Sequence, residues 1–284
     1  MIPAYNAEAY LARAIQSVWE QTVAPAEVIV VEDGSTDATA DVAAGFRERV
    51  RLIRQANAGP SEARNVGVQA ARGGWVAFLD ADDEWLPEKL ERQIPLLSED
   101  RTAVVCCGKL RPGGRRGLHW LTFEELWESN EIVTSTAVVR RDVLLSLGGF
   151  EKRLRACEDW HLWLRLSSAG WNIACLYEDL YRYRSAPGSL SQRILPFTEA
   201  HAEVVRRIGE SVGLAPERIR GRCAAAYEAG GRSALHVRQL ALARQLLVRS
   251  LRLQFTAVRA GLLAAACLPR PALDALRHLR GSVR

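Results

Sequence analysis

Short apolar strands alternate with amphipathic helices along the first 79 residues, and this order constrains the fold more than any other feature. The segments begin with a helix and alternate thereafter, over residues 10–21, 28–31, 37–49, 50–54, 61–71 and 75–79. Leu11, Ile15 and Val18 recur at three- to four-residue spacing, which indicates the buried face of a helix. The run at 28–31 is β-branched throughout, which is typical of a strand covered on both faces. The order predicts an α/β fold with a parallel sheet between layers of helices.

Acidic residues follow two of the predicted strands. Asp33 comes after the strand at 28–31, and Asp80, Asp82 and Asp83 come after the strand at 75–79. Parallel sheets bind ligands outside the carboxyl ends of their strands, so we expect Asp33 and Asp80 to face one crevice. Asp80 and Asp82 point to the same side if extended geometry continues. Mg²⁺ or Mn²⁺, held together with substrate phosphates, would relieve their repulsion.

Each acid also has a plainer interpretation. Asp82 or Asp83 could cap a helix that begins near Pro87, which explains one acid but not all three. Asp33 lies before a Gly-Ser pair and could make a turn and a cap, or it could accept a hydrogen bond from a nucleobase or a ribose. Arg64 is either a surface arginine or a bidentate contact to a diphosphate.

A third group of candidates lies further along the chain. Glu158 and Asp159 open a predicted helix at 158–167. Asp159 is either a general base whose pKa is tuned by partial burial or an N-terminal helix cap. The basic, aromatic run at 181–184 is either a strand edge or a lid that grips phosphate.

Composition separates the ends of the chain and excludes some kinds of site. The net charge is +5, and the tail from about Arg193 is rich in Arg, Ala and Leu. Such a tail suits an anionic partner such as a lipid surface, a nucleic acid or a phosphorylated substrate, or it is a solvated helix face. The six cysteines form no C-x-x-C pair, which argues against zinc and favours buried, reduced thiols. No apolar run approaches the roughly 20 residues of a membrane span.

Four segments together resemble the family 2 glycosyltransferases of the GT-A fold. They read IPAYNAEAYLARAIQSVWEQT, VIVVEDGSTD, NAGPSEARNVGVQAARGGWVAFLDADDEWLPEKL and CEDWHLWLRLSSAG. The resemblance runs from Ile2 to about Ser191, roughly two thirds of the chain. Several ordered motifs at compatible spacings are more specific than the D-x-D pattern alone.

The resemblance implies a Rossmann-like, mostly parallel sheet and a two-part domain. Residues 1–192 would form the GT-A domain, with a nucleotide-binding half at 1–100 and an acceptor half at 101–192. Residues 193–284 would form an α-helical extension. Such a sheet should open with its own strand, yet only Met1 and Ile2 precede Pro3. We therefore expect a truncated first strand, with apolar residues upstream of Met1.

The resemblance also implies roles for individual residues on the donor side. Pro3 and Tyr5 would line the pocket of the nucleotide base, and Asp33 would bond to that base. Arg64 belongs to the A-R-N segment near the donor. Asp80 would face the ribose and the sugar.

Two further acids would carry the chemistry. Asp82 would hold Mg²⁺ or Mn²⁺, which stabilises the charge that develops on the leaving diphosphate. Asp159 would take the proton of an acceptor hydroxyl during a single in-line displacement that inverts the anomeric centre. Many relatives carry a histidine within the segment that corresponds to 185–191, where this chain has none. A protein contact to the diphosphate or the metal would then be missing, or Arg182 or Arg184 would supply it.

The resemblance therefore predicts an inverting glycosyltransferase with a nucleotide-sugar donor, UDP being the expected nucleotide. Its acceptor would be a glycan or a lipid-linked sugar in bacterial cell-surface polysaccharide or glycolipid synthesis. We expect a cytoplasmic protein with no nucleic-acid partner. Its basic C-terminal helices would either make peripheral contact with the inner face of the membrane or form a plain helical packing domain.

Two alternatives stay open. A sugar nucleotidyltransferase should show a Gly-rich, basic loop near its start, and residues 3–6 lack one. A degenerate nucleotide-sugar-binding module should have lost a metal ligand or the base, yet Asp82 and Asp159 are both present.

Overall fold

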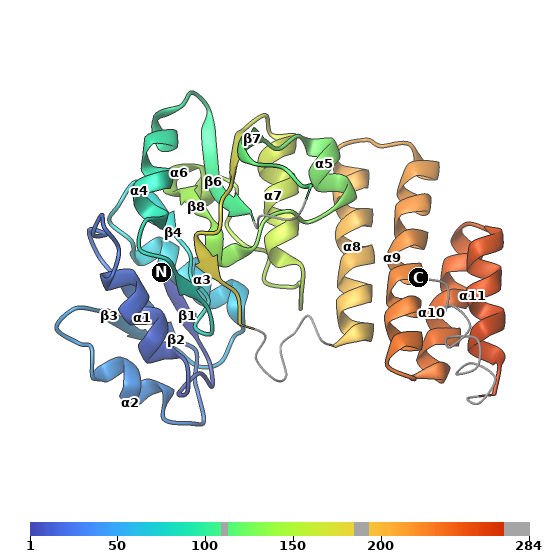
Figure 1. The fold of residues 1–284 in the computed structure, drawn as a ribbon, viewed down its shortest axis with the longest axis horizontal. Helices are drawn as coiled ribbons and strands as arrows, with labels where there is room; N and C mark the ends of the chain where they lie inside the picture. Colours follow the sequence, from blue (N-terminus) through green and yellow to red (C-terminus); the bar gives the residue numbers. More distant parts are fainter. Residues whose placement is uncertain (109–112, 185–192, 270–284) are drawn as a thin grey trace. The chain divides into compact units, whose positions relative to one another are not determined.

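The computed structural model describes residues 1–108, 113–184 and 193–269. The chain divides into two compact units, residues 1–187 and 188–284. Figure 1 shows the mixed α/β first unit in blue to yellow and the helical second unit in orange and red.

The first part of unit one is a parallel sheet in the order β1-β2-β3. The Met1 amino group donates to the Ala77 carbonyl at 2.8 Å, and the Leu79 N–H donates to the Met1 carbonyl. These two bonds join β1 to β4 and make the two main sheets continuous. The strands are β1 (Ile2–Ala4), β2 (Ile29–Glu32), β3 (Arg51–Arg54) and β4 (Trp75–Ala77), and the helices are α1 (Leu11–Trp19), α2 (Thr39–Ala44) and α3 (Pro60–Ala70).

The second part of unit one is a mixed sheet in the order β4-β8-β6-β9-β7. Strands β6 and β9 pair in parallel, and the other neighbours are antiparallel. Every residue of β6 is buried, as a strand at the centre of a sheet requires. The strands are β6 (Thr102–Gly108), β7 (Gly117–Trp120), β8 (Val138–Arg140) and β9 (Asn172–Tyr177), and the helices are α4 (Lys89–Gln93), η1 (Ile94–Ser98), α5 (Phe123–Glu128), η2 (Thr134–Thr136), α6 (Arg141–Ser146) and α7 (Glu158–Ser168).

One apolar core runs through both parts of unit one. It joins Leu11 and Ile15 of α1 to Leu79, Trp85 and Val138 from the second part. A small antiparallel ladder of β5 (Glu84–Trp85) and β10 (Tyr181–Arg182) lies beside this core. The predicted α/β class is therefore confirmed. Four of the seven pairings between described strands are antiparallel, which the sequence pattern did not indicate.

Several predicted element ends are wrong. Helix α2 is shorter than 37–49, and its N-cap is Ala38 instead of Ser35 or Thr36. Asp37 accepts hydrogen bonds from both the N–H and the hydroxyl of Thr39, which fixes a turn where the pattern predicts helix. Helix α4 has Glu88 at its N-cap position without a side-chain cap bond, so neither Asp82 nor Asp83 caps it.

Unit two consists of successive helices, each of which packs against the next along the chain. They are α8 (Ile194–Ser211), α9 (Pro216–His236), α10 (Leu240–Leu253) and α11 (Ala257–Cys267). The helical C-terminal region is thus confirmed. All six cysteines are free, and five are buried as expected, but Cys267 is exposed.

Candidate active site

Arg64 joins the two acidic segments that the sequence singles out. It lies on α3 and is only 5% exposed, so the surface-arginine interpretation is wrong. One terminal nitrogen donates to Asp80 Oδ1 at 2.8 Å and the other to Glu158 Oε1 at 2.6 Å. Burial alone would lower the pKa of Arg64, but these two carboxylates outweigh burial and raise it. Because both terminal nitrogens already bind carboxylates, the geometry favours a positioning role over a bidentate grip on a diphosphate.

The acids after β4 lie in three different environments. Asp80 is about one third exposed and is held by Arg64 and, through its N–H, by Ser135 Oγ at 3.1 Å. Asp83 is buried and accepts from Ser135 Oγ at 2.6 Å and from the Arg184 N–H at 2.9 Å. Burial raises the pKa of Asp83 to about 7 against the effect of these two bonds, and the charges of Asp80 and Asp82 add to the rise. The interpretation of Asp83 as a helix cap is wrong, since it anchors the chain after β10.

Asp82 differs from both neighbours. It is partly exposed, and burial, followed by the charge of Asp80, raises its pKa. Among the described residues, no side chain of another residue donates a hydrogen bond to its carboxylate. Asp82 is therefore the acid of this run whose charge is least compensated.

The acids at this strand end fit a hard divalent cation. Asp80 and Asp82 offer carboxylate oxygens, which Mg²⁺ and Mn²⁺ prefer, and one or two carboxylates suffice when substrate phosphates complete the coordination. Across the described ranges, no group of three or more His, Cys, Asp or Glu side chains is placed to hold a metal by itself. A cation here would thus need the substrate as a further ligand.

Asp33 braces the loop that leads into α3. It is buried at the end of β2 and accepts from Gln55 Nε2 at 2.7 Å, Ala58 N at 2.9 Å and Gly59 N at 2.9 Å. Gly59 has a φ of 87°, which favours glycine at this turn. A nucleobase would have to share an acceptor that already has three protein donors. Pro3 is partly buried, and Tyr5 is exposed directly after β1.

Asp159 lies in the first turn of α7, beside Glu158. One oxygen accepts from Asn130 Nδ2 and Thr134 Oγ1, each at 3.2 Å, and the other accepts from the Trp160 N–H at 2.7 Å. Burial raises the pKa of Asp159 to about 6, the charge of Glu158 adds to the rise, and Arg64 opposes it. A general base works best with a pKa near the working pH.

The alternative interpretation of Asp159 as a helix cap is wrong. The N-cap position of α7 belongs to Cys157, which adopts a left-handed conformation without a side-chain cap bond.

The sequence did not single out several residues that shape this site. Glu158 was noted only as a neighbour of Asp159, yet it binds Arg64. Asn65 accepts from the Phe150 N–H at 2.8 Å and donates to the Phe150 carbonyl at 2.9 Å, which fixes the chain that approaches α7. The sequence points to Asn65 only through its place beside Arg64 in the A-R-N segment.

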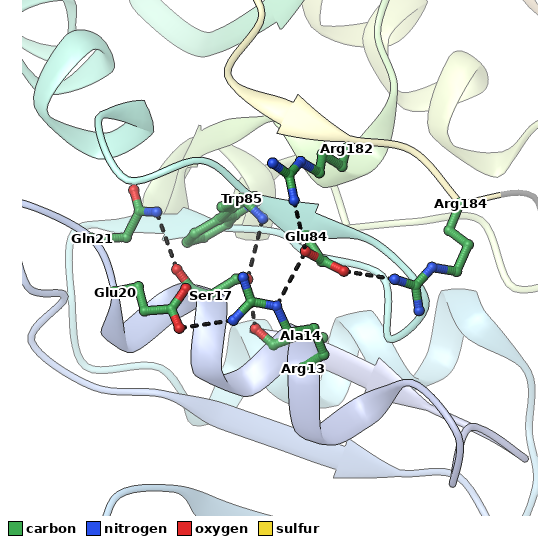
Figure 2. A network of polar contacts seen from close by, with 9 residues as sticks. All are labelled: Arg13, Ala14, Ser17, Glu20, Gln21, Glu84, Trp85, Arg182 and Arg184. Atoms are coloured by element: carbon green, nitrogen blue, oxygen red, sulfur yellow. Dashed lines mark hydrogen bonds and ion pairs between the residues drawn. The ribbon is translucent and has the colours of Figure 1, made fainter.

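The buried carboxylate of Glu84 binds arginines from two distant segments of the chain. Glu84 on β5 binds Arg184 at 2.6 Å, Arg13 of α1 at 3.2 Å and, more distantly, Arg182 at 3.8 Å. Figure 2 shows these three guanidinium groups around Glu84. Residues 181–182 form β10, as the strand-edge interpretation expected. The histidine-free segment at 185–191 lies outside the described residues.

Residues 1–146 match the sequence profile of Glycosyl transferase family 2. The chain belongs to this family. The match includes the acids after β2 and β4 and ends before α7. It therefore does not extend to Asp159, whose surroundings are described by its contacts in the structure.

Relatives and solved structures agree with the family. The uncharacterized glycosyltransferase EpsJ of Bacillus subtilis is 28% identical over 73% of this chain and 66% of its own length. The putative teichuronic acid biosynthesis glycosyltransferase TuaG of the same organism is 30% identical over 66% of this chain and 79% of its own.

Among solved structures, residues 1–349 of Staphylococcus aureus TarS superpose with a TM-score of 0.62 and 19% identity, over 89% of this chain and 79% of that one. The mannosyltransferase PcManGT of Pyrobaculum calidifontis superposes with a TM-score of 0.62 and 20% identity, over 96% of this chain and 82% of its own. These likenesses confirm the predicted GT-A fold of the glycosyltransferase.

Proposed function

We propose that this glycosyltransferase moves a sugar from a UDP-linked donor to a hydroxyl acceptor, with inversion and with Mg²⁺ or Mn²⁺. One observation carries the proposal: Arg64 holds Asp80, at the donor end of β4, and Glu158, the neighbour of Asp159, on its two terminal nitrogens. One buried cation thereby holds one donor acid, Asp80, and the residue next to the proposed base.

The chemistry follows from the environments of these groups. Asp82, with Asp80 beside it, would hold the cation, and the cation would stabilise charge on the leaving diphosphate. Asp159 removes the acceptor proton while the oxygen attacks the anomeric carbon. Arg64 stays charged throughout, because its pKa is raised. A single displacement needs no covalent enzyme intermediate.

The remaining donor residues would select the nucleotide. Pro3 and Tyr5 lie at the end of β1 and would line the base pocket, and Asp33 would bond to the base. TarS has been solved with UDP and with UDP-GlcNAc, and PcManGT with GDP-Man and Mn²⁺. We favour UDP over GDP, and the Mn²⁺ of PcManGT supports a metal here.

The biological setting belongs to the same proposal. The name of TuaG refers to teichuronic acid biosynthesis, which supports a role in cell-surface glycan assembly on a glycan or lipid-linked acceptor. Residues 1–192 would form the catalytic domain and 193–284 the extension. We place the enzyme at the cytoplasmic side of the membrane, with no nucleic-acid partner.

Donor hydrolysis by the full chain tests the proposal without a known acceptor. UDP- and GDP-linked sugars are incubated with Mn²⁺ or Mg²⁺, and release of the nucleoside diphosphate is measured. We expect metal-dependent release of UDP from at least one donor, and stabilisation of the protein against heat by that donor. Formation of a nucleoside triphosphate from a UDP-sugar and pyrophosphate would indicate a nucleotidyltransferase instead. Stabilisation by donor without any turnover would indicate a binding module.

A further inference from the structure

Helix α11 reverses the pattern of a helix at a protein surface. Its one charged residue, Arg259, is buried and binds Glu228 at 3.0 Å and the Gln254 carbonyl at 2.9 Å. The outer face contains no charged residue and exposes apolar or small side chains at Ala257, Val258, Gly261, Ala264 and Cys267. A surface helix normally turns its charged residues outward.

The apolar face continues into the link before α11. Phe255 is 75% exposed and Val258 is 58% exposed, the two most exposed large apolar side chains among the described residues. Three positions separate them, so both lie at the start of α11. The inner side of the helix is occupied, because Leu262 and Leu263 pack on the core formed with α9 and α10.

The sequence around this face has an excess of positive charge. Residues 229–273 contain seven arginines and neither Asp nor Glu. Arg249 and Arg259 bind carboxylates from α8 and α9. Arg252, in the last turn of α10, is exposed, and within the described part of the chain no carboxylate pairs with it. Exposed apolar side chains beside the unpaired, exposed Arg252 complement an anionic interface that is apolar a few ångströms below its surface.

We propose that the outer face of α11, with Phe255 and Arg252, lies on the surface of an anionic lipid bilayer. Among the described helices none is long and apolar enough to span a membrane, so the contact is interfacial. Phe255 and Val258 enter the boundary between headgroups and acyl chains, while Arg252 binds lipid phosphate. The proposal deepens the proposed function, because a lipid-linked acceptor would be presented at this surface.

Vesicle co-sedimentation of the full chain tests the proposal. We expect binding to phosphatidylcholine vesicles that contain phosphatidylglycerol, little binding to phosphatidylcholine alone, and weaker binding in high salt. Phe255→Ser should weaken binding about tenfold or more through lost apolar burial, and Arg252→Gln about fivefold through lost charge. The matched pair Val258→Ser and Val212→Ser compares the proposed face with an exposed valine at the end of α8, and only the first should reduce binding.

Hydrogen exchange provides a readout that needs no variant. Amides of residues 254–267 should gain protection on phosphatidylglycerol vesicles, while those of α8 should not. The proposal is overturned if the full chain ignores these vesicles, if Phe255→Ser binds as tightly as the unaltered chain, or if Phe255→Ser instead converts a dimer into a monomer. Donor hydrolysis is measured without vesicles. An unaltered chain that hydrolyses donor but does not bind the vesicles therefore refutes this surface and leaves the proposed function standing.

Discussion

Replacing Arg64 with methionine should destabilise unit one severely. The side chain is 5% exposed and binds two carboxylates, of which Glu158 is buried and Asp80 about one third exposed. Removing one partner of a buried ion pair costs about 3–5 kcal/mol, because the other charge remains buried without compensation. Most of this cost should come from Glu158, since Asp80 can gain water. We expect Arg64→Met to lower the free energy of unfolding by about 3–5 kcal/mol.

Urea denaturation followed by tryptophan fluorescence measures this loss in the correct unit. All eight tryptophans lie between residues 19 and 171, so their emission reports unit one even if unit two unfolds separately. With a slope of roughly 2 kcal/mol per molar urea, the midpoint should fall by about 1.5–2.5 M. Adding Glu158→Gln to Arg64→Met should restore part of the loss, because the uncompensated buried charge disappears.

A matched control separates burial from ion-pair geometry. Arg92 donates to both oxygens of Glu178, at 2.7 and 2.9 Å, but its side chain is 55% exposed. Arg92→Met should therefore shift the urea midpoint far less than Arg64→Met, because the exposed ion pair is screened by water. If Arg64→Met costs no more than Arg92→Met, the buried bridge between Asp80 and Glu158 does not stabilise the site and the reasoning fails.

Four further results are expected. Asp159→Asn should lower the rate constant of transfer by about a thousandfold while calorimetry shows unchanged donor affinity; full retained activity would contradict the assignment of the base. The rate should fall as the pH drops below about 6, since only ionised Asp159 accepts a proton, and Glu158→Gln should move this fall to lower pH because it removes the charge that raises the pKa. Asp82→Asn should raise the Mn²⁺ concentration for half-maximal activity by more than about tenfold; an unchanged Mn²⁺ titration would place the metal elsewhere. Glu84→Gln should lower the free energy of unfolding by about 2 kcal/mol in the same urea assay. A midpoint shift near zero would show that water solvates the arginines around residue 84 as well as the carboxylate does.

The local sequence pattern was sufficient to predict an element where burial of one or both of its faces determines the sequence. The β-branched run that becomes β2 and the apolar spacing of α1 follow from burial on known faces, and both elements were predicted within two residues. Strand β8 was missed because it is three residues long and lies between two short helices, η2 and α6, which leaves too few residues for a periodic pattern. Helix α2 was predicted too long at both ends. The bond between Asp37 and Thr39 delays its start, and the chain continues in turns from Gly45 onward.

Contacts between distant segments were beyond the sequence pattern. Arg64 and Glu158 are 94 positions apart, and nothing in either segment indicates a buried pair, because an arginine in a helix usually faces water. Only the family resemblance placed Asp80 and Asp159 near one donor. For the basic tail the sequence left an anionic partner or a solvated helix face open, and it did not indicate that Arg259 of α11 points inward to Glu228.

The run from Asp80 to Glu84 shows why residue type alone cannot assign a metal ligand. Asp80 is compensated by Arg64, and Asp83 by Ser135 and the Arg184 N–H. Glu84 is compensated by Arg13 of α1 and by the Arg184 side chain after β10. Asp82 is the acid that these described protein contacts leave uncompensated, and its pKa is raised by its burial and by Asp80. A cation that binds there gains the full attraction of one carboxylate and removes its repulsion with the next, whereas at Asp83 it would have to displace two hydrogen bonds. The physical argument for Asp82 as the ligand is therefore the compensation of its neighbours, which only the folded chain reveals.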